Sequence, residues 1–371
     1  MPVVQVSVIT TVFNEGAAAL EMLDSVITGN VAPAEIVVAD GGSTDGTLEL
    51  LEGYAETHPQ VRVLADTGGR SAGRNAAIEA ASHDHIVSID GGCLAEAGWL
   101  EEITGPLLEG ADWVAGFYRP AGRSPLSTAI GLTMVFVIDE VVFPDFTPSA
   151  RSMGFHRQLW EEVGGFPEDE QFAEDTAFGE ALVAAGHEAR FVPDAVVGWR
   201  PPSSLMAQSR TLFSWGRGDG HLGLRSINYR YLFPRFLSSG ALVLIGIVFP
   251  VLVLAAPLPL VPMVYRKSRS KYRHMGGRLK WLLIPLATVN GLAFSLAGYI
   301  TGYVERRSGR WGGGLPSRSG EAALAPLLQP FEERGDTTIP GGGFGVGAQG
   351  APLLGSEFQG IVDPGGELRG I

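Results

Sequence analysis

Apolar runs of strand length alternate with helical patterns along the N-terminal part of the chain. The runs that predict strands cover residues 6–12, 36–40, 61–65 and 85–89. The segments between them predict helices over residues 17–28, 47–56 and 69–81. Strands that alternate with helices of this length indicate an α/β fold, in which a parallel sheet has helices on both faces.

The second predicted strand ends at Asp40, within the sequence A-E-I-V-V-A-D-G-G-S-T-D-G-T that begins at Ala34. Gly41 and Gly42 permit a tight turn that brings the backbone close to a ligand, and Ser43 can cap the following helix. A carboxylate at the C-terminal end of a parallel strand, beside a helix N-terminus, is where open α/β sheets bind nucleotides. We therefore predict that Asp40 accepts hydrogen bonds from a base or ribose. A plain strand-turn-helix with a solvated carboxylate is the alternative.

A series of ordered motifs resembles those of the family-two inverting glycosyltransferases. The motifs are V-S-V-I-T-T-V-F-N-E, V-V-A-D-G-G-S-T-D-G-T, G-R-S-A-G-R-N-A-A-I, V-S-I-D-G-G-C, G-G-F-P-E and F-A-E-D-T-A-F. The resemblance covers residues 3–218 and implies the GT-A fold, a nucleotide-binding mixed sheet flanked by helices and joined to an acceptor-binding half. It also implies sugar transfer from a nucleotide-diphosphate donor with inversion at the anomeric carbon.

The resemblance also suggests which residues bind the donor. Arg70 and Arg74 are four positions apart, hence on one face of a helix, and a guanidinium suits phosphate through its paired donors. For these arginines the alternative is a surface ion pair with Glu79 or Asp66, and for Glu15 it is a charge favoured by the helix macrodipole. The set predicted to bind the donor is Glu15, Asp40, Gly42, Ser43, Arg70, Arg74, Asn75, Asp90 and Gly91.

Asp90, at the end of the fourth predicted strand, is the candidate ligand for a divalent cation, Mg²⁺ or Mn²⁺. Such a cation would stabilise the charge on the diphosphate leaving group. In the family pattern a second acidic residue stands two positions on, but this chain has Gly92 there. Coordination by Asp90, phosphate oxygens and water suits Mg²⁺, and partly metal-independent binding stays open. Cys93 is a soft ligand that suits neither ion, and we expect it to be a small buried residue.

The resemblance puts the carboxylate that deprotonates the acceptor at Asp175, with Glu174 as its neighbour. A helix is predicted to begin at these residues and to run to about residue 185. One carboxylate near a second can have a raised pKa and so serve as a general base near neutral pH. The alternative is that both are first-turn residues stabilised by the helix dipole.

The acceptor side of the chain carries fewer signals. Trp199 and Trp215 are candidates either to stack on sugar rings or to anchor at a membrane interface. Processive relatives carry Gln-x-x-Arg-Trp in this region, whereas Gln208, Arg210 and Trp215 lack that spacing. Polymer synthesis is therefore not expected.

Two long segments without charged residues, 236–264 and 281–304, follow the predicted catalytic region. At about 1.5 Å per residue, each as a helix exceeds the roughly 30 Å hydrocarbon core of a bilayer. The domains expected are a GT-A domain over residues 1–220, a juxtamembrane segment over 221–235, a membrane region over 236–304, and a Gly- and Pro-rich disordered tail over 305–371.

The linker between these segments, residues 266–280, is basic and contains no acidic residue. The positive-inside rule predicts a cytoplasmic linker, whereas a cytoplasmic catalytic domain followed by one crossing would put it outside. A first segment that forms a re-entrant or helical hairpin would resolve the conflict, and its candidate breaks are Pro250, Pro257, Pro259 and Pro262. A linker that lies along anionic lipid headgroups would also resolve it, and the sequence does not choose between them.

Charge and cysteine content narrow the class of protein. A formal net charge of −13 and a pI of about 5.0 argue against a nucleic-acid binder. The single cysteine, Cys93, precludes an internal disulfide and is compatible with a reducing compartment. The first apolar run lacks a basic n-region, so no signal peptide is evident.

The function expected is sugar transfer, with inversion, from a nucleotide-diphosphate sugar to a hydroxyl of a lipid-linked, glycan or other membrane-proximal acceptor. The enzyme would contact membrane lipids and act at the cytoplasmic membrane face. One alternative is a catalytically silent scaffold that binds nucleotide sugars, motivated by Gly92. The other is a sugar nucleotidyltransferase, which would carry a Gly-rich loop and a basic residue where this chain has T-V-F-N-E-G.

Overall fold

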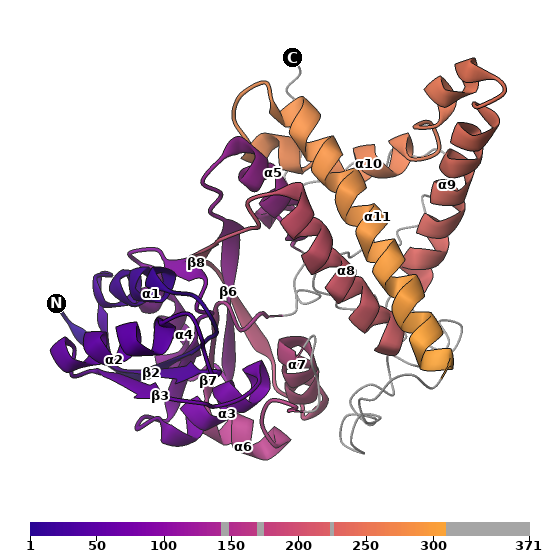
Figure 1. The fold of residues 1–371 in the computed structure, drawn as a ribbon. Coiled ribbons are helices and arrows are strands. Elements are labelled where there is room, and N and C mark those ends of the chain that lie inside the picture. Colours follow the sequence, from indigo (N-terminus) through magenta and orange to yellow (C-terminus); the bar gives the residue numbers. More distant parts are fainter. Residues whose placement is uncertain (142–147, 169–173, 223–225, 309–371) are drawn as a thin grey trace, which may run out of the picture.

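The computed structural model describes residues 1–141, 148–168, 174–222 and 226–308 (Figure 1). In this part of the chain an α/β domain precedes a group of long helices. The α/β domain contains an eight-stranded sheet with the strand order β3-β2-β1-β4-β7-β6-β8-β5. The tail expected over residues 305–371 lies outside the described residues from position 309, and residues 305–307 belong to a helix.

Strands and helices alternate in the first half of the sheet, as the hydrophobic pattern predicts. The elements are β1 (Val3–Val12), α1 (Ala17–Ile27), β2 (Ala32–Asp40), α2 (Thr47–Thr57), β3 (Val61–Leu64), α3 (Arg70–Ala80) and β4 (His85–Ser88). These four strands are parallel, with β1 between β2 and β4 and with β3 at the edge. The carboxyl ends of β2 and β4 therefore flank the end of β1.

The second half of the sheet reverses direction. Its elements are β5 (Cys93–Ala95), α4 (Trp99–Leu108), β6 (Trp113–Pro120), α5 (Pro125–Met134), η1 (Ile138–Glu140), β7 (Met153–His156), α6 (Arg157–Val163), α7 (Glu174–Ala184) and β8 (Ala189–Trp199). Strand β7 runs antiparallel to both β4 and β6, while β8 is parallel to β6 and antiparallel to β5. The sheet is therefore mixed and GT-A-like, as the resemblance implies, and not parallel throughout as the alternation alone suggests.

Two apolar layers hold the helices against the sheet (Figure 1). On one face, residues of α1 and α4 pack against inward-facing side chains of β1, β2 and β6. On the other face, α3, α6 and α7 cover the sheet, where the rings of Phe166 and Phe178 stack and the ring of Phe155 packs against them at an angle. Burial of these large apolar side chains fixes α7, and with it the E-D-T motif, against the strands.

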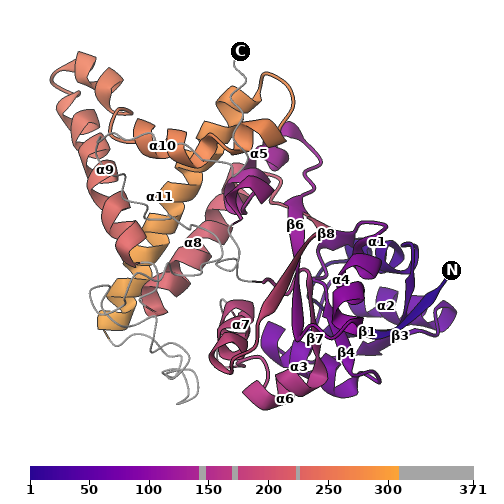
Figure 2. The ribbon, with the colours of Figure 1, turned by 180° about the vertical axis from the view of Figure 1, so that it is seen from behind.

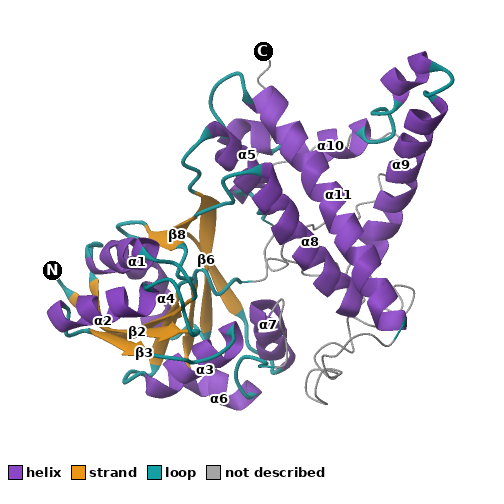
Figure 3. Cartoon of the chain, in the orientation of Figure 1, coloured by secondary structure: helices purple, strands orange, loops and turns teal. Residues whose placement is uncertain are grey.

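The second part of the structure is helical (Figure 3). Its elements are α8 (Leu205–Leu222), α9 (Ser226–Ile245), η2 (Pro250–Ala255), α10 (Val261–Ser268), η3 (Lys271–His274) and α11 (Lys280–Arg307). Helices α8 and α11 lie side by side, and α9 stands on the far side of α11 from the sheet (Figures 1 and 2). Glycines permit this approach, because a Cβ on Gly298 would overlap the carbonyl oxygen of Phe213.

The first uncharged segment, residues 236–264, is not one continuous helix. Helix α9 ends at Ile245, and the chain continues through η2 before α10 begins at Val261. Pro250 and Pro262 stand in the first turns of η2 and α10, where the missing proline N–H costs nothing. Two of the prolines that the sequence offers as candidate breaks, Pro250 and Pro262, thus stand where new elements begin.

Among the described residues, α11 is the one helix long and apolar enough to cross a membrane. Large apolar side chains are also exposed along the α9–η2–α10 arm, which comprises residues 226–268. They include Leu237, Leu244, Ile247, Val248, Val251, Leu254 and Leu258. The basic linker does not extend away from the α/β domain, since Lys271 Nζ donates to the Val135 carbonyl (3.1 Å) and to Glu140 (2.6 Å).

Candidate active site

The Asp40 carboxylate organises the turn at the end of β2. Its Oδ1 accepts hydrogen bonds from the backbone N–H groups of Gly42 (3.0 Å) and Ser43 (2.9 Å), and its Oδ2 accepts one from Ser43 Oγ (2.6 Å). Gly42 has φ +87°, a left-handed conformation that favours glycine. Asp40 itself is fully buried. Asp40, which was predicted to bind the nucleotide, therefore stabilises its own turn and positions Gly42 and Ser43.

Glu15 lies beside the position where the family pattern has a second acid. Its carboxylate oxygens are 3.8 and 3.9 Å from the place that a Cβ on Gly92 would occupy. Burial raises the pKa of Glu15; Arg200 opposes this rise, and the charges of Asp90 and Asp45 add to it. A carboxylate thus stands at the end of β1 although position 92 offers none.

Gly91 occupies a position with no room for a side chain. A Cβ there would meet the Val12 Cγ1 at 2.8 Å and the Thr11 carbonyl oxygen at 2.9 Å. The backbone after Asp90 therefore lies directly against the end of β1. This close approach brings the Asp90 carboxylate to the same edge of the sheet as Glu15.

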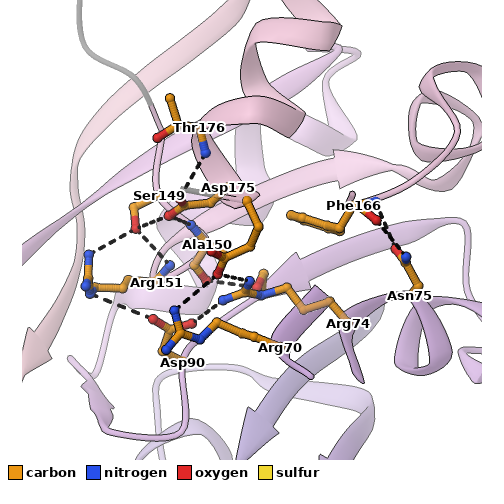
Figure 4. Close-up of polar contacts among 12 residues, drawn as sticks. Arg70, Arg74, Asn75, Asp90, Ser149, Ala150, Arg151, Phe166, Asp175 and Thr176 are labelled. Atoms are coloured by element: carbon orange, nitrogen blue, oxygen red, sulfur yellow. Dashed lines mark hydrogen bonds and ion pairs between the residues drawn. The ribbon is translucent and has the colours of Figure 1, made fainter. Parts of the chain in front are cut away.

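Arg74 joins two acidic groups from distant parts of the chain (Figure 4). Its buried guanidinium donates from Nη1 to Glu174 Oε1 (2.7 Å) and from Nη2 to Asp90 Oδ1 (2.8 Å). The more exposed Arg70 lies 3.4 Å from the same Glu174 oxygen. Both predicted arginines thus pair within the site, and not with Glu79 or Asp66.

The ion pairs set the protonation of the two carboxylates. Burial alone would raise the pKa of Asp90, but Arg74, Arg151 and Arg70 bring it below its usual value. Burial likewise opposes ionisation of Glu174, yet Arg74 and Arg70 lower the pKa of that carboxyl. The raised pKa expected of a carboxylate pair is therefore not found at Glu174, because two guanidinium groups outweigh the effect of burial.

Asp175 is oriented by hydrogen bonds from the segment before β7. Its Oδ2 accepts from Ser149 Oγ (2.9 Å) and from the Ala150 N–H (3.3 Å), and its Oδ1 accepts from the Thr176 N–H (2.9 Å). These bonds hold the carboxylate at the N-terminus of α7, close to the ion pairs of Asp90 (Figure 4).

Arg151 is part of this cluster, although it belongs to none of the sequence motifs. Its Nη1 donates to Ser149 Oγ (3.2 Å), and its Nε lies 3.8 Å from Asp90 Oδ2. The guanidinium lies over the rings of Tyr118 and Trp199, 5.1 and 5.4 Å from their centroids. These contacts come from separate elements, so no local spacing could have pointed to Arg151. Trp199, predicted to stack on a sugar or anchor at a membrane, stacks here on a cation.

Asn75, which was predicted to bind the donor, makes hydrogen bonds that stabilise a turn. Its Oδ1 accepts from Trp160 Nε1 (2.9 Å) and the Phe166 N–H (2.9 Å), and its Nδ2 donates to the Phe166 carbonyl (2.8 Å) and Glu168 (3.0 Å). These bonds use the donor and acceptor capacity of the amide. Asn75 therefore fixes the Gly-Gly-Phe-Pro turn, apart from the ion-paired cluster (Figure 4).

The carboxylates at this edge of the sheet are compatible with a sparsely coordinated divalent cation. No group of three or more His, Cys, Asp and Glu residues suited to a metal occurs in the described part of the chain. Asp90 and Glu15 are the available carboxylates, and this pair fits a Mg²⁺ or Mn²⁺ ion that takes further ligands from phosphate and water. Cys93 is buried, which raises the pKa of its thiol and so disfavours the metal-binding thiolate.

The sheet and its polar edge define a class of protein. Carboxylates and arginines converge at the C-terminal ends of parallel strands, on a mixed sheet covered by helices. This arrangement is that of a nucleotide-binding α/β domain of the GT-A type. Residues 7–157 match the model of Glycosyl transferase family 2.

Curated relatives agree with that family. Glycosyltransferase AglE of Haloferax volcanii is 25% identical over 222 residues, which make up 58% of this chain and 72% of AglE. The uncharacterized glycosyltransferase YibD of Escherichia coli is 34% identical over 87 residues, 23% of this chain and 25% of YibD. Among solved structures, the mannosyltransferase PcManGT from Pyrobaculum calidifontis, in complex with GDP-Man and Mn²⁺, has a TM-score of 0.48 at 21% identity, covering 83% of this chain and 88% of that chain.

Proposed function

We propose that this chain transfers a sugar from a nucleotide-diphosphate sugar to an acceptor hydroxyl, with inversion at the anomeric carbon. The observation that carries the proposal is the convergence of Asp90 and Asp175 on one polar cluster. Arg151 and Ser149 connect them on one side, and Arg74 and Glu174 on the other. The family match of residues 7–157 supports the same reaction class.

In the proposed mechanism Asp175 is the general base. It takes the proton of the acceptor hydroxyl while the acceptor oxygen attacks the anomeric carbon opposite the departing diphosphate. A general base of this kind typically contributes about 10²–10⁴-fold to the rate. Glu174 does not share this task, since its ion pair with Arg74 lowers its pKa, which makes it a weaker base, and anchors the first turn of α7.

The donor is proposed to bind across the ends of β1, β2 and β4. Glu15 and the turn held by Asp40 face the nucleoside, and Arg70 is exposed enough to reach a phosphate oxygen. A divalent cation near Asp90 would neutralise diphosphate charge when bound. The protein groups at this edge thus include acceptors for the ribose hydroxyls and the base N–H groups, and donors for the phosphates.

We further propose a lipid-linked or membrane-proximal acceptor and a cytoplasmic catalytic domain. The arm of residues 226–268 exposes large apolar side chains, which is the expected property of a lipid-facing surface. Lys271 ties the basic linker to the α/β domain, so the arm leaves that domain and returns to it. A re-entrant arm of this kind keeps the basic linker and the catalytic domain on one membrane side, in agreement with the positive-inside rule.

A ligand screen of the detergent-solubilised protein tests the reaction. Thermal unfolding is measured with UDP-, GDP- and dTDP-sugars, each with and without Mn²⁺, and the cognate donor is expected to raise the unfolding temperature by mass action. Transfer is then assayed for wild type and Asp175→Asn. Turnover that survives Asp175→Asn would remove Asp175 as the base. Binding without any turnover by wild type would favour the scaffold, and formation of a nucleotide sugar from sugar phosphate would favour a nucleotidyltransferase.

Cysteine labelling in oriented membrane vesicles tests the proposed topology. Cys93 is buried, so new cysteines at two exposed positions, Arg119→Cys in the α/β domain and Arg278→Cys in the linker, report the two regions separately. Both are expected to react with an impermeant maleimide in the same vesicle orientation. Reaction in opposite orientations would contradict the re-entrant arm.

A further inference from the structure

We propose that the Arg151 guanidinium binds the donor diphosphate and stabilises the negative charge on the leaving phosphate oxygen. The inference rests on the proposed function and extends it to a residue outside the predicted set. Its starting point is the Arg151 Nε, which is buried and has no hydrogen-bond partner among the described residues. An unsatisfied buried donor on a charged group is costly unless a ligand completes it.

The guanidinium is held in place by groups that leave this donor free. Tyr118 and Trp199 present their ring faces to Arg151, and contacts of this kind attract a cation without using its N–H groups. Ser149 takes a bond from Nη1 only. The 3.8 Å between Nε and Asp90 Oδ2 exceeds hydrogen-bond range. The side chain is thus fixed in advance, which reduces the entropy lost when an anion binds.

The neighbouring arginines differ from Arg151 in this respect. Both terminal nitrogens of Arg74 donate at short range to carboxylates, so its charge is already balanced within the protein. Arg70 is largely solvent-exposed, with 64% of its side chain accessible, and water screens its charge. Arg151 combines an enclosed guanidinium with a free donor beside Asp90. A phosphate oxygen at that point would pair with Nε through a charge-assisted hydrogen bond.

The position of Arg151 also suits the transfer step. It donates to Ser149, which in turn donates to Asp175, so it stands between Asp90 on the donor side and the proposed base. In the step, a bond forms between the acceptor oxygen and the anomeric carbon, and the bond from that carbon to the diphosphate oxygen breaks. The bonding electron pair goes to the diphosphate oxygen, and the acceptor proton goes to Asp175. Arg151 would face the oxygen on which negative charge grows.

Nucleotide titrations of the full-length protein test the assignment. The affinities of UDP, GDP and dTDP and of the matching monophosphates are measured by calorimetry for wild type, Arg151→Met, Arg151→Lys and Arg119→Met. Arg119 pairs with Glu96 at the surface and is the matched control. Arg151→Met is expected to weaken binding of the cognate diphosphate by about tenfold or more, the size of a charge-assisted hydrogen bond. Monophosphate binding is expected to change by less than about threefold. The reason is that Arg151 is proposed to contact the second phosphate, which a monophosphate lacks.

Arg151→Lys keeps the charge but removes Nε and the planar fork, so an intermediate loss is expected. If Arg151→Met does not fold, the diphosphate affinity of Arg151→Lys is compared with that of wild type to test the assignment. Equal losses for diphosphate and monophosphate, or diphosphate affinity equal to wild type in both variants, would overturn the assignment. So would reduced turnover with unchanged diphosphate affinity, since Arg151 would then act on the acceptor. If the wild type binds no nucleotide, the proposed function is wrong. If the wild type binds nucleotide and both variants bind it with equal affinity, only the assignment of Arg151 is wrong.

Discussion

Arg74 and Glu174, 100 positions apart in the chain, form a buried ion pair in which Nη1 lies 2.7 Å from Oε1. The second arm of the same guanidinium binds Asp90 at 2.8 Å. One side chain on α3 therefore joins the parallel half of the sheet to the first turn of α7. The proposed base, Asp175, follows Glu174 directly, so this contact determines where the base stands relative to the donor site.

Replacement of Arg74 by methionine is expected to destabilise the protein strongly. The change leaves Glu174 buried without its main partner, and breaking a buried pair in this way costs about 3–5 kcal/mol. The free energy of unfolding in denaturant measures the loss. Arg119→Met is the control, because its exposed pair with Glu96 is expected to contribute no more than about 1 kcal/mol. Similar stabilities for the two variants would contradict a structural role for the Arg74 pair.

The same ion pair predicts how stability responds to acid. The pKa of Glu174 is lowered in the folded state from its ordinary value of 4.5, because Arg74 and Arg70 outweigh the effect of burial. The unfolded state therefore binds the proton first, and the stabilisation is complete above pH 4.5 and is lost as the pH falls through the folded pKa. Glu174→Gln is expected to be less stable than wild type at neutral pH and to lose less stability on acidification. Unfolding curves recorded from neutral pH to below pH 4.5 measure both effects, and parallel pH profiles would refute the idea.

The parallel half of the fold was predictable because its signals are local. Strand-length apolar runs ending in Asp40 and at Asp90 indicate β2 and β4, and β1 to β4 occur at the predicted positions. The antiparallel strand β7 was not predicted, because its four residues carry no periodic pattern. It forms through hydrogen bonding to β4 and β6, which are distant in the sequence. Prolines in the segment 236–264 are candidate breaks in the sequence, and new elements begin at Pro250 and beside Pro262.

The candidate site was predictable where a motif contains the residue and not where tertiary packing supplies it. The acids of the motifs, Asp90 and Asp175, do converge on one cluster. Sequence spacing could not tell that Glu174 would pair with Arg74, or that Asn75 would be used by the turn at Phe166. Arg151 was missed for the same reason, since its two ring contacts and its neighbour Asp90 come from separate elements.

The hydroxyl of Ser149 is expected to position the proposed base. Ser149→Ala removes the 2.9 Å hydrogen bond to Asp175 Oδ2 and the 3.2 Å hydrogen bond from Arg151 Nη1, and it leaves the backbone bond from Ala150 and the two ring contacts of Arg151. Loss of one hydrogen bond to a charged group predicts a fall in kcat of about tenfold, with little change in the KM for the donor. Steady-state kinetics measure this split. Ser82→Ala is the control, because Ser82 binds Glu35 away from the site. A change in KM alone would indicate that Ser149 serves the donor and not the base.

Close approach of α8 and α11 predicts opposite outcomes for two glycine-to-alanine substitutions. A Cβ at Gly298 would overlap the Phe213 carbonyl oxygen, whereas a Cβ at Gly240, within α9, meets no atom within 4 Å. Gly298→Ala is therefore expected to separate the helices and to lower stability by about 1–3 kcal/mol, the usual cost of overpacking. Gly240→Ala is expected to be neutral or stabilising by up to about 1 kcal/mol, because alanine favours the helix. Thermal unfolding in one detergent compares the two variants, and equal unfolding temperatures would mean that α8 and α11 do not pack through Gly298.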